Sequence, residues 1–368
     1  MRIDEDRKFM SRALELAVRG MGHTRPNPMV GAVLVKDGRI IGEGWHDHYG
    51  DLHAERAALK DCAQRGESAR GAELYVTLEP CCHHGKQPPC TDALIEAGIS
   101  HVYVGSGDPN PKVAGQGIAL LRAGGIQVTE QVLEAECRAL NDIFFHYITS
   151  GLPLVYLKYA MTLDGKIACY TGASRWVSGE AARAEVHRLR NRCAAIMVGV
   201  NTVEQDDPLL TCRMEGGRSP LRIICDSTLR TPLDSRIMQS AAEIPTLLAT
   251  CCENSDRAQR YEALGCRILL CPGRDGRVDL PALMRTLGTM QIDSVLLEGG
   301  AELAWSALRD GVVQRVQAYI APKLFGGSSA KTPVGGTGFA APGQAIQLKH
   351  TQLKQLGEDY LIEGEVIR

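Results

Sequence analysis

Short apolar runs separated by amphipathic stretches are the feature that most constrains how this chain can fold. Continuous apolar runs of four to nine residues are typical of strands covered on both faces. Helical patterns fit between them, notably at 181–193 and 301–311. Strands alternating with helices predict an α/β fold with a largely parallel sheet. In the second half the runs lie at 154–162, 194–202, 221–227, 246–250, 266–271, 294–300 and 316–324.

The first half carries a different series of predicted elements, and the segment Thr149-Ser-Gly-Leu-Pro153 separates the two series. A turn at Lys36-Asp-Gly38 joins the first two predicted strands. We find no internal repeat, so we predict two different α/β domains, residues 1–149 and 152–368. The expected strands of the first half are 30–38, 39–46, 73–80, 101–108 and 126–130, and the expected helices are 4–20, 53–66, 91–97, 115–124 and 133–148.

The composition, 44% hydrophobic and 23% charged, is that of a soluble globular protein. There is no apolar run of about 18 residues, so no membrane span is expected. The first residues lack the apolar stretch of a signal peptide. Thirteen cysteines are scattered along the chain, several inside apolar runs, which favours reduced thiols and a cytoplasmic location over a disulfide framework.

The charge distribution argues against a nucleic-acid partner. Residues 1–150 carry 16 Lys or Arg and 20 Asp or Glu, a net charge of −4, and the remainder carries 25 and 23, a net charge of +2. Neither half has the basic excess needed for tight binding to a phosphate backbone. A small-molecule substrate is therefore favoured.

A cluster of metal-binding residue types lies in the first half. His53-Ala-Glu55 opens a predicted helix, and Pro80-Cys81 follows a predicted strand, with Cys90 nine positions further on. A catalytic zinc needs three protein ligands and an open position for water, whose pKa it lowers to ~7. A glutamate two residues from a ligand can move the water proton. This His-x-Glu…Pro-Cys arrangement is found in zinc deaminases.

Other ligand sets stay open on spacing alone. The common second motif is Cys-x-x-Cys, and its fourth position here is His84, so Cys81 with His84, or a set that uses Cys82, also fits. We favour Cys90, because it begins a predicted helix whose positive end stabilises a thiolate. The alternatives are a purely structural zinc site or unrelated buried thiols. A structural site has no use for Glu55, and the full set of motifs makes a chance occurrence of the thiols less likely.

The motifs of the first half resemble the cytidine-deaminase superfamily. The segments are Asn27-Pro-Met-Val-Gly31, His53-Ala-Glu55, Thr77-Leu-Glu-Pro-Cys-Cys-His-His-Gly-Lys-Gln-Pro-Pro-Cys90 and Asp108-Pro-Asn-Pro-Lys-Val-Ala-Gly115. More narrowly, they resemble the bifunctional pyrimidine deaminase–reductases of riboflavin biosynthesis, which have the long Pro-Cys-x8-Cys spacing. The resemblance implies an αβα sandwich, with His53, Cys81 and Cys90 as zinc ligands and Glu55 as proton shuttle.

Neighbouring residues are expected to hold the substrate. Asn27 stands between two prolines with a donor and an acceptor available for the pyrimidine edge. His83, His84 and Lys86 offer donors to a substrate phosphate.

The second half resembles the reductase part of the same family, which has a dihydrofolate-reductase-like fold and uses NADPH. The matching segments are Leu157-Lys-Tyr-Ala-Met-Thr-Leu-Asp-Gly165, Ser174-Arg-Trp176, Gly199-Val-Asn-Thr202, Asp206-Asp-Pro208 and Ile320-Ala-Pro-Lys-Leu-Phe-Gly326. In addition, Gly299-Gly300 lies between a predicted strand and helix, where backbone N–H groups can bind phosphate.

The resemblance implies residue roles in this half. The implied substrate contacts are Ser174, Arg190, Leu210, Arg213 and Glu298, with the two arginines suited to a ribose 5-phosphate. The implied NADPH contacts are Ala160, Trp176, Thr202, Asp206, Ser227, Gly300, Ala301, Glu302, Leu303, Ala304, Trp305 and Ser306. Lys158 is a candidate electrophile at the ribose carbonyl.

We therefore expect an enzyme that removes an amino group from a phosphorylated diaminopyrimidine, using Zn²⁺, and then reduces its ribosyl group to ribityl with NADPH. Apolar edges in the second domain predict a homo-oligomer. A transfer-RNA adenosine deaminase with an added domain is disfavoured by the charge of the first half. A non-enzymatic zinc module is disfavoured by Glu55.

Overall fold

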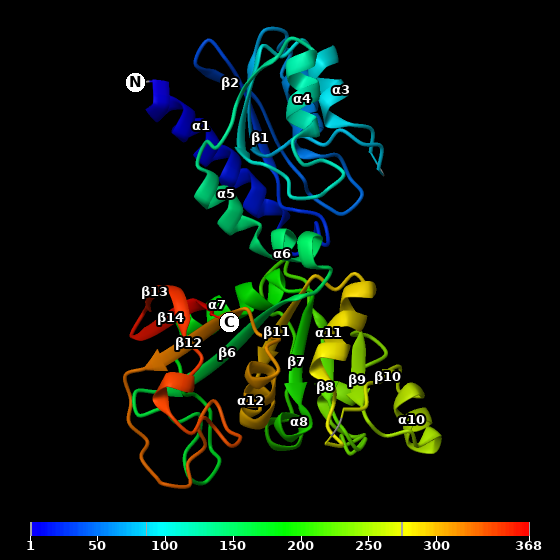
Figure 1. The fold of residues 1–368 in the computed structure, drawn as a ribbon, viewed down its shortest axis with the longest axis vertical. Coiled ribbons are helices and arrows are strands. Elements are labelled where there is room, and N and C mark those ends of the chain that lie inside the picture. The colour runs from blue at the N-terminus through cyan, green and yellow to red at the C-terminus, as the bar shows by residue number, and fades with distance from the viewer. Residues whose placement is uncertain (1, 86, 274, 368) are drawn as a thin grey trace. The chain divides into compact units, whose positions relative to one another are not determined.

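The computed structural model describes residues 2–85, 87–273 and 275–367, which divide into two compact units, Met1–Gly151 and Leu152–Arg368 (Figure 1). Within these ranges we find no helix with the length and apolar character needed to cross a membrane.

The first unit is built on a five-stranded mixed sheet in the order β2-β1-β3-β4-β5. β1 pairs antiparallel with both β2 and β3, whereas β3, β4 and β5 are parallel. The strands are β1 (Gly31–Lys36), β2 (Arg39–Trp45), β3 (Glu73–Leu78), β4 (His101–Ser106) and β5 (Gln127–Thr129).

Successive side chains in these strands pack alternately into two separate hydrophobic cores, one on each face of the sheet. Leu74 and Val76 of β3 pack on one face, while Tyr75 between them packs on the other. This period of two is what an extended strand imposes. The first face is covered by α2 (Ala54–Gln64), α3 (Cys90–Glu96) and α4 (Gln116–Ala123). The second face is covered by α1 (Arg2–Ala17) and α5 (Glu134–Leu140) (Figure 1). The short helix η1 (Val18–Gly20) continues α1. The predicted αβα sandwich is confirmed.

The helix predicted at 133–148 is in fact two helices, α5 and α6 (Asp142–Ser150), with a break at Asn141. The Asn141 side chain accepts a hydrogen bond from the N–H of Met29 and donates one to its carbonyl oxygen, both at 2.8 Å. An asparagine that bonds to the backbone competes with helix geometry. This contact with the segment after Asn27 joins parts of the chain 112 residues apart, so the single-helix prediction was wrong for a tertiary reason.

The second unit holds a nine-stranded sheet in the order β10-β9-β8-β7-β11-β6-β12-β14-β13 among its described residues. The strands from β10 to β12 are parallel, and β14 pairs antiparallel with both β12 and β13. They are β6 (Leu154–Thr162), β7 (Ala195–Gly199), β8 (Leu221–Cys225), β9 (Thr246–Thr250), β10 (Arg267–Leu270), β11 (Ser294–Glu298), β12 (Arg315–Ala321), β13 (Leu348–Leu356) and β14 (Asp359–Val366).

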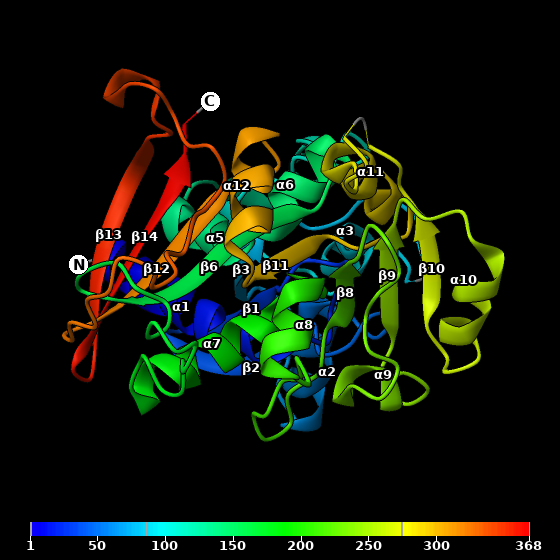
Figure 2. The same ribbon diagram turned by 90° about the horizontal axis from the view of Figure 1, so that it is seen from below.

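Both faces of this sheet are covered by helices, and Figure 2 shows β13 and β10 at its two ends. α11 (Leu280–Thr289) and α12 (Ala301–Arg309) pack on the large core, whereas α7 (Glu180–Arg192) packs on Tyr319 and Leu361 on the opposite side. The predicted α/β class is confirmed. The β13–β14 hairpin was not predicted, because its first strand is polar and exposed. The remaining helices are α8 (Val200–Asp206), α9 (Arg236–Gln239), α10 (Ser255–Glu262) and the short η2 (Pro342–Gln344).

Candidate functional site

His53 and Glu55 are positioned by a close approach of α2 to β2. Gly44 of β2 has no side chain at the point of contact, and a Cβ there would lie 2.3 Å from the backbone nitrogen of Ala58. Only glycine allows the helix so near the strand. His53 caps the start of α2 with an extended backbone, and Glu55 follows in its first turn.

Cys81 and Cys90 lie next to His53 and come from the segment that runs from the end of β3 into α3. Cys81 follows β3, and Cys90 is the first residue of α3. The backbone N–H of Cys90 donates to the carbonyl oxygen of Cys81 at 3.0 Å, and to its Sγ at 3.4 Å. These bonds close the base of the loop between the two cysteines. Arg56 donates to the carbonyl oxygen of Pro89 at 2.8 Å and so ties the loop to α2.

The resulting group fits a tetrahedral zinc ion. Zinc bonds of about 2.0 Å to nitrogen and 2.3 Å to sulfur put two ligand atoms about 3.5 Å apart. The Nδ1 of His53 lies 3.4 Å from the Sγ of Cys81 and 3.5 Å from the Sγ of Cys90. Hydrogen bonds from Cys90 and His53 lower the pKa of Cys81. Three ligand atoms within 4.8 Å of one another leave the fourth corner open.

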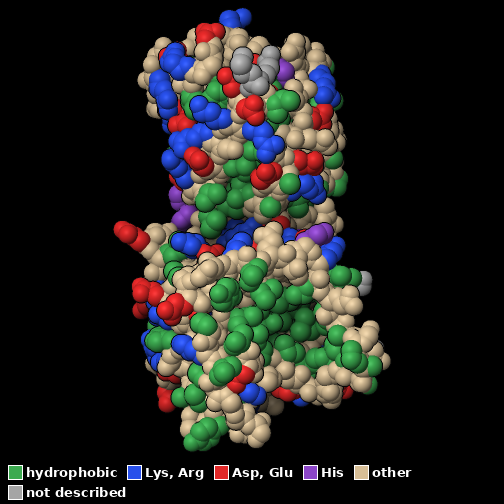
Figure 3. Space-filling model, turned by 90° about the vertical axis from the view of Figure 1, so that its left-hand side faces the viewer, with side chains coloured by type: hydrophobic (Ala, Val, Ile, Leu, Met, Phe, Trp, Pro, Cys, Tyr) green, Lys and Arg blue, Asp and Glu red, His purple; other side chains and the backbone are tan. Residues whose placement is uncertain are grey.

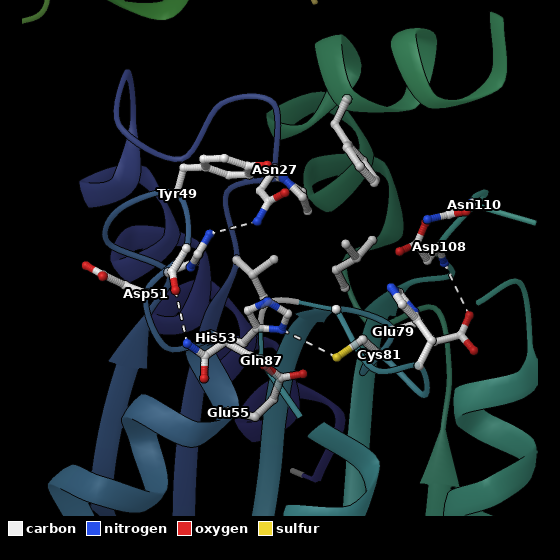
Figure 4. Close-up of a pocket in the computed structure, with 18 residues that line it drawn as sticks. Asn27, Tyr49, Asp51, His53, Glu55, Glu79, Cys81, Gln87, Asp108 and Asn110 are labelled. Carbon is white, nitrogen blue, oxygen red and sulfur yellow. Dashed lines mark hydrogen bonds between the residues drawn. The ribbon is translucent and has the colours of Figure 1, made fainter. Parts of the chain in front are cut away.

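Glu55 lies beside this group without joining it. Its side chain is buried, and burial raises the pKa of its carboxyl group. A carboxyl group with a raised pKa can both accept and release a proton near neutral pH. Glu55 also lines the cavity of about 260 Å³ that contains His53 and Cys81, so proton exchange with a bound molecule is geometrically open to it (Figure 4).

Asn27 projects into the same cavity and is oriented by His46 (Figure 4). The Nδ1–H of His46 donates to the carbonyl oxygen of Leu52 at 3.1 Å. The Nε2 of His46 is then an acceptor, and it lies 3.2 Å from the Nδ2 of Asn27. Burial lowers the pKa of His46, which keeps the ring neutral. The Oδ1 of Asn27 is left to accept from a ligand.

Sequence reasoning assigned no role to Asp108 and Asn110, which line the opposite wall. Burial raises the pKa of Asp108 to about 6. Their only sequence signal was the Asp-Pro-Asn-Pro segment, because they follow β4 and meet the metal-binding group only in the folded chain. Of the proposed phosphate-binding residues, His83 lines the cavity, and its buried Nδ1 has no partner among the described residues. His84 does not line it, and Lys86 lies outside the described residues.

The second unit has its own polar centre around Glu298, at the end of β11. Arg190 of α7 donates to both carboxylate oxygens of Glu298, at 2.8 and 3.0 Å, and the Nζ of Lys158 lies 3.7 Å from the same group. Burial opposes ionisation, but the charges of Arg190 and Lys158 lower the pKa of Glu298 to about 2. Glu298 occupies the fork of Arg190 in this structure, and the grip of two arginines on one phosphate stays a prediction.

A cavity of about 310 Å³ surrounds this centre. It contains each residue that was expected to contact the substrate here. These are Ser174, Arg190, Leu210, Arg213 and Glu298. Arg213 is exposed, and its Nε lies 3.2 Å from a ring nitrogen of His187. Arg213 is therefore better placed than Arg190 to bind a phosphate.

A larger cavity of about 740 Å³ adjoins it. Gly299 and Gly300 separate β11 from α12 with positive φ angles of 84° and 88°, and they bring the N–H groups at the start of α12 to the cavity wall. This cradle fits the phosphates of a dinucleotide. Of the expected cofactor contacts, Ala160, Trp176 and Ala304 line the smaller cavity only, Thr202, Asp206 and Gly300 line both, and Ser227, Ala301, Glu302, Leu303 and Ser306 line the larger.

Trp305 is the exception among those contacts. It lines neither cavity, and its ring is buried against Phe339 with ring centroids 5.0 Å apart. Consecutive residues of a helix point in different directions, so the contact predicted for Trp305 is the one in this run that neither cavity supports.

Two family models match the chain. Residues 3–106 match the cytidine and deoxycytidylate deaminase zinc-binding region, and residues 153–362 match the RibD C-terminal domain. Each match falls within one of the two units.

Two relatives match nearly the whole length of the chain. The riboflavin biosynthesis protein RibD of Actinobacillus pleuropneumoniae is 52% identical over 362 residues, which is 98% of this chain and 96% of the relative. RibD of Escherichia coli is 41% identical and covers 96% of this chain and 98% of its own.

Solved structures agree with the model. The diaminohydroxyphosphoribosylaminopyrimidine deaminase/5-amino-6-(5-phosphoribosylamino)uracil reductase of Thermotoga maritima has a TM-score of 0.88 at 38% identity, and all of both chains is covered. RibD of Acinetobacter baumannii has a TM-score of 0.87 at 35% identity, again with full coverage.

Proposed function

The chain belongs to the RibD family of riboflavin biosynthesis proteins, and on that premise we propose which of its residues perform each of two reactions. It is a bifunctional enzyme with a zinc-dependent deaminase unit and an NADPH-dependent reductase unit. We assign hydrolysis of the amino group of 2,5-diamino-6-(5-phosphoribosylamino)pyrimidin-4-one to residues 1–149. We assign reduction of the ribosyl group of 5-amino-6-(5-phosphoribosylamino)uracil to residues 152–368.

In the deaminase unit, His53, Cys81 and Cys90 hold zinc, and Glu55 moves the protons. When bound, zinc supplies a water that is acidic enough to be a nucleophile near neutral pH. Glu55 accepts the proton that this water loses and delivers it to the departing amine, so water and the amino compound become the carbonyl compound and ammonia. Its buried position beside the metal-binding group supports both roles.

The pyrimidine is held by the walls of the same cavity. Asn27 accepts a hydrogen bond from the ring through its Oδ1, because its Nδ2 is engaged by His46. His83 lines the same cavity and donates to the substrate phosphate.

In the reductase unit, Glu298 and Arg213 bind the substrate, and Lys158 acts on the ring oxygen of its ribose. NADPH, when bound, supplies the hydride. The Nζ of Lys158 is buried, and burial lowers its pKa. A buried ammonium group that faces the cavity can donate its proton to that oxygen as the bond between the oxygen and C1′ breaks, so that hydride adds to C1′ and the ring oxygen becomes a hydroxyl group. Arg190 acts indirectly, because it holds Glu298 in place.

The single observation that carries this proposal is the His53–Cys81–Cys90 group with buried Glu55 beside it. The test is incubation of the whole protein with the phosphorylated diaminopyrimidine, with and without NADPH, followed by mass analysis. Without NADPH we expect one amino nitrogen to be replaced by oxygen, and with NADPH a further gain of two hydrogens. A substrate recovered unchanged in both incubations would contradict the assignment.

We further propose that the enzyme works in the cytoplasm as a homo-oligomer. The cysteines are all free thiols in the structure, as a reducing compartment requires. Hydrophobic side chains gather on the face that carries the β13–β14 hairpin (Figure 3), where Leu353 and Tyr360 are exposed. Light scattering during size-exclusion chromatography tests the oligomer, and a monomeric mass at micromolar concentration would contradict it.

A further inference from the structure

The two cavities of the second unit share a rim. Ile167, Thr202, Asp206, Gly299 and Gly300 line both of them. A dinucleotide that delivers a hydride to a substrate beside Glu298 must place its nicotinamide at this rim. The adenosine then lies at the other end of the larger cavity.

That other end is formed where β8 ends. In the sheet, β8 is separated from β6 by β11 and β7, so three strand spacings of about 4.8 Å put it roughly 14 Å away. An extended dinucleotide spans a distance of this size. Cys225, Val278 and Leu280 give this end apolar surface for a base, and Ser227, Arg230 and Arg277 give it polar groups.

NADPH differs from NADH only by the phosphate on the 2′-oxygen of the adenosine ribose. We propose that Arg230 binds this 2′-phosphate and so determines the preference for NADPH. The inference rests on the proposed reductase function and adds the residue that selects its cofactor. An arginine is suited to the role because its planar fork matches phosphate oxygens.

The backbone that carries Arg230 is held in place. Asp226 is fully buried at the end of β8. Its carboxylate accepts from the N–H groups of Arg230 and Thr231, both at 2.7 Å, and from the hydroxyl of Thr231 at 2.7 Å. The segment between β8 and α9 is thereby ordered before any ligand arrives, which reduces the entropy cost of binding.

The guanidinium is also directed towards the cavity while one edge stays open. It donates to Glu204 at 2.7 Å and to the side chain of Asn201, both on α8. Its Nε–H has no hydrogen bond among the residues that the structure describes. The pair with Glu204 is partly exposed, and exposed ion pairs contribute little to stability. A doubly charged phosphate can therefore share or replace that contact.

Arg277 is the natural comparison, because its guanidinium lines the same end of the cavity. It contacts Glu302 at 3.5 Å, and its side chain is 60% exposed. Among the described residues, no buried carboxylate holds its backbone as Asp226 holds that of Arg230. We expect Arg277 to contact both dinucleotides alike.

The test is direct binding of NADPH and NADH to the whole protein, followed by dihydronicotinamide fluorescence. Loss of a charged hydrogen bond predicts that Arg230→Gln raises the dissociation constant for NADPH by roughly 10- to 100-fold. The constant for NADH should change by less than about threefold, which also shows that the variant is folded. Arg277→Gln should leave the ratio of the two constants within about threefold of its original value.

Displacement by 2′,5′-ADP, which carries the 2′-phosphate without nicotinamide, gives an independent readout. It should displace NADPH from the unaltered protein at a lower concentration than 5′-ADP does. For Arg230→Gln, the two compounds should displace NADPH at equal concentrations. Equal weakening of NADPH and NADH by Arg230→Gln, or a selective loss of NADPH in Arg277→Gln instead, would overturn the assignment. If the unaltered protein bound neither nucleotide, the reductase function itself would fail, and this inference with it.

Discussion

Glu55 shows how burial prepares one side chain for two proton transfers. It sits in the first turn of α2, faces the cavity, and contributes no atom to the metal-binding group. Replacement by glutamine keeps the shape and removes the acid–base function. We expect Glu55→Gln to retain one zinc per chain and to lose ammonia release by a factor on the order of 10² to 10⁴. Metal analysis and an ammonia assay measure the two quantities, and unaltered ammonia release would contradict the role.

Two adjacent thiols, Cys81 and Cys82, form a matched pair for testing the ligand set. The Sγ of Cys81 lies beside His53, whereas the Sγ of Cys82 is turned towards the carbonyl oxygen of Lys112 at 3.7 Å. We expect Cys81→Ser to lose stoichiometric zinc and Cys82→Ser to keep it. Zinc content after dialysis distinguishes the two variants, and the reverse result would move the ligand from one residue to the other.

Glu298 makes the second unit sensitive to acid. Its pKa of about 2 in the folded chain lies below the ordinary 4.5, so its contribution to stability is complete above about pH 4.5 and is lost as the pH falls towards 2. A shift of this size corresponds to about 3 kcal/mol. We expect Glu298→Gln to be less stable at pH 7 and to lose less stability between pH 4.5 and 3. Urea unfolding at several pH values measures this, and parallel curves for the two proteins would count against it.

At the scale of elements, the site depends on how closely α2 approaches β2. A Cβ at Gly44 would lie 2.4 Å from the carbonyl oxygen of Ala54, the residue between His53 and Glu55. The clash is with backbone, so α2 must move as a whole.

We therefore expect Gly44→Ala to cost about 1–3 kcal/mol of unfolding free energy and to weaken zinc retention, although residue 44 contacts no zinc ligand through a side chain. Gly343→Ala is the control, because a Cβ there meets nothing within 4 Å. Thermal unfolding and zinc content report the two effects. If the Gly44→Ala variant were destabilised but kept all of its zinc, the metal site would not depend on how closely α2 packs on β2, and the prediction would be contradicted.

At the scale of the whole molecule, each unit has its own sheet, its own cores and its own cavity. The two reactions should therefore be separable by removing zinc. We expect a chelator to abolish deamination in the intact protein and to leave reduction of the already deaminated substrate within about twofold of its original rate. NADPH oxidation followed by absorbance measures the second reaction. A decline of NADPH oxidation in proportion to zinc content would show that the reductase also needs the metal.

The local patterns of the sequence determined the α/β class, the order of most elements and the residue types of the metal-binding group. Strand alternation and the spacing of His53, Glu55, Cys81 and Cys90 are properties of short segments, so they can be read without the fold. The β13–β14 hairpin could not be predicted from the sequence, because its first strand is exposed and has no apolar pattern.

Only the tertiary structure decided which groups meet. It brought Cys81 rather than Cys82 beside His53, and it paired Arg190 with Glu298 across 108 residues. It also packed the ring of Trp305 against Phe339. Neighbouring side chains point in different directions, and contacts between segments far apart in the chain produce no repeating pattern in the sequence. The chemistry of the site could thus be predicted from its residues, but the partner of each side chain depended on the packing of elements far apart in the chain.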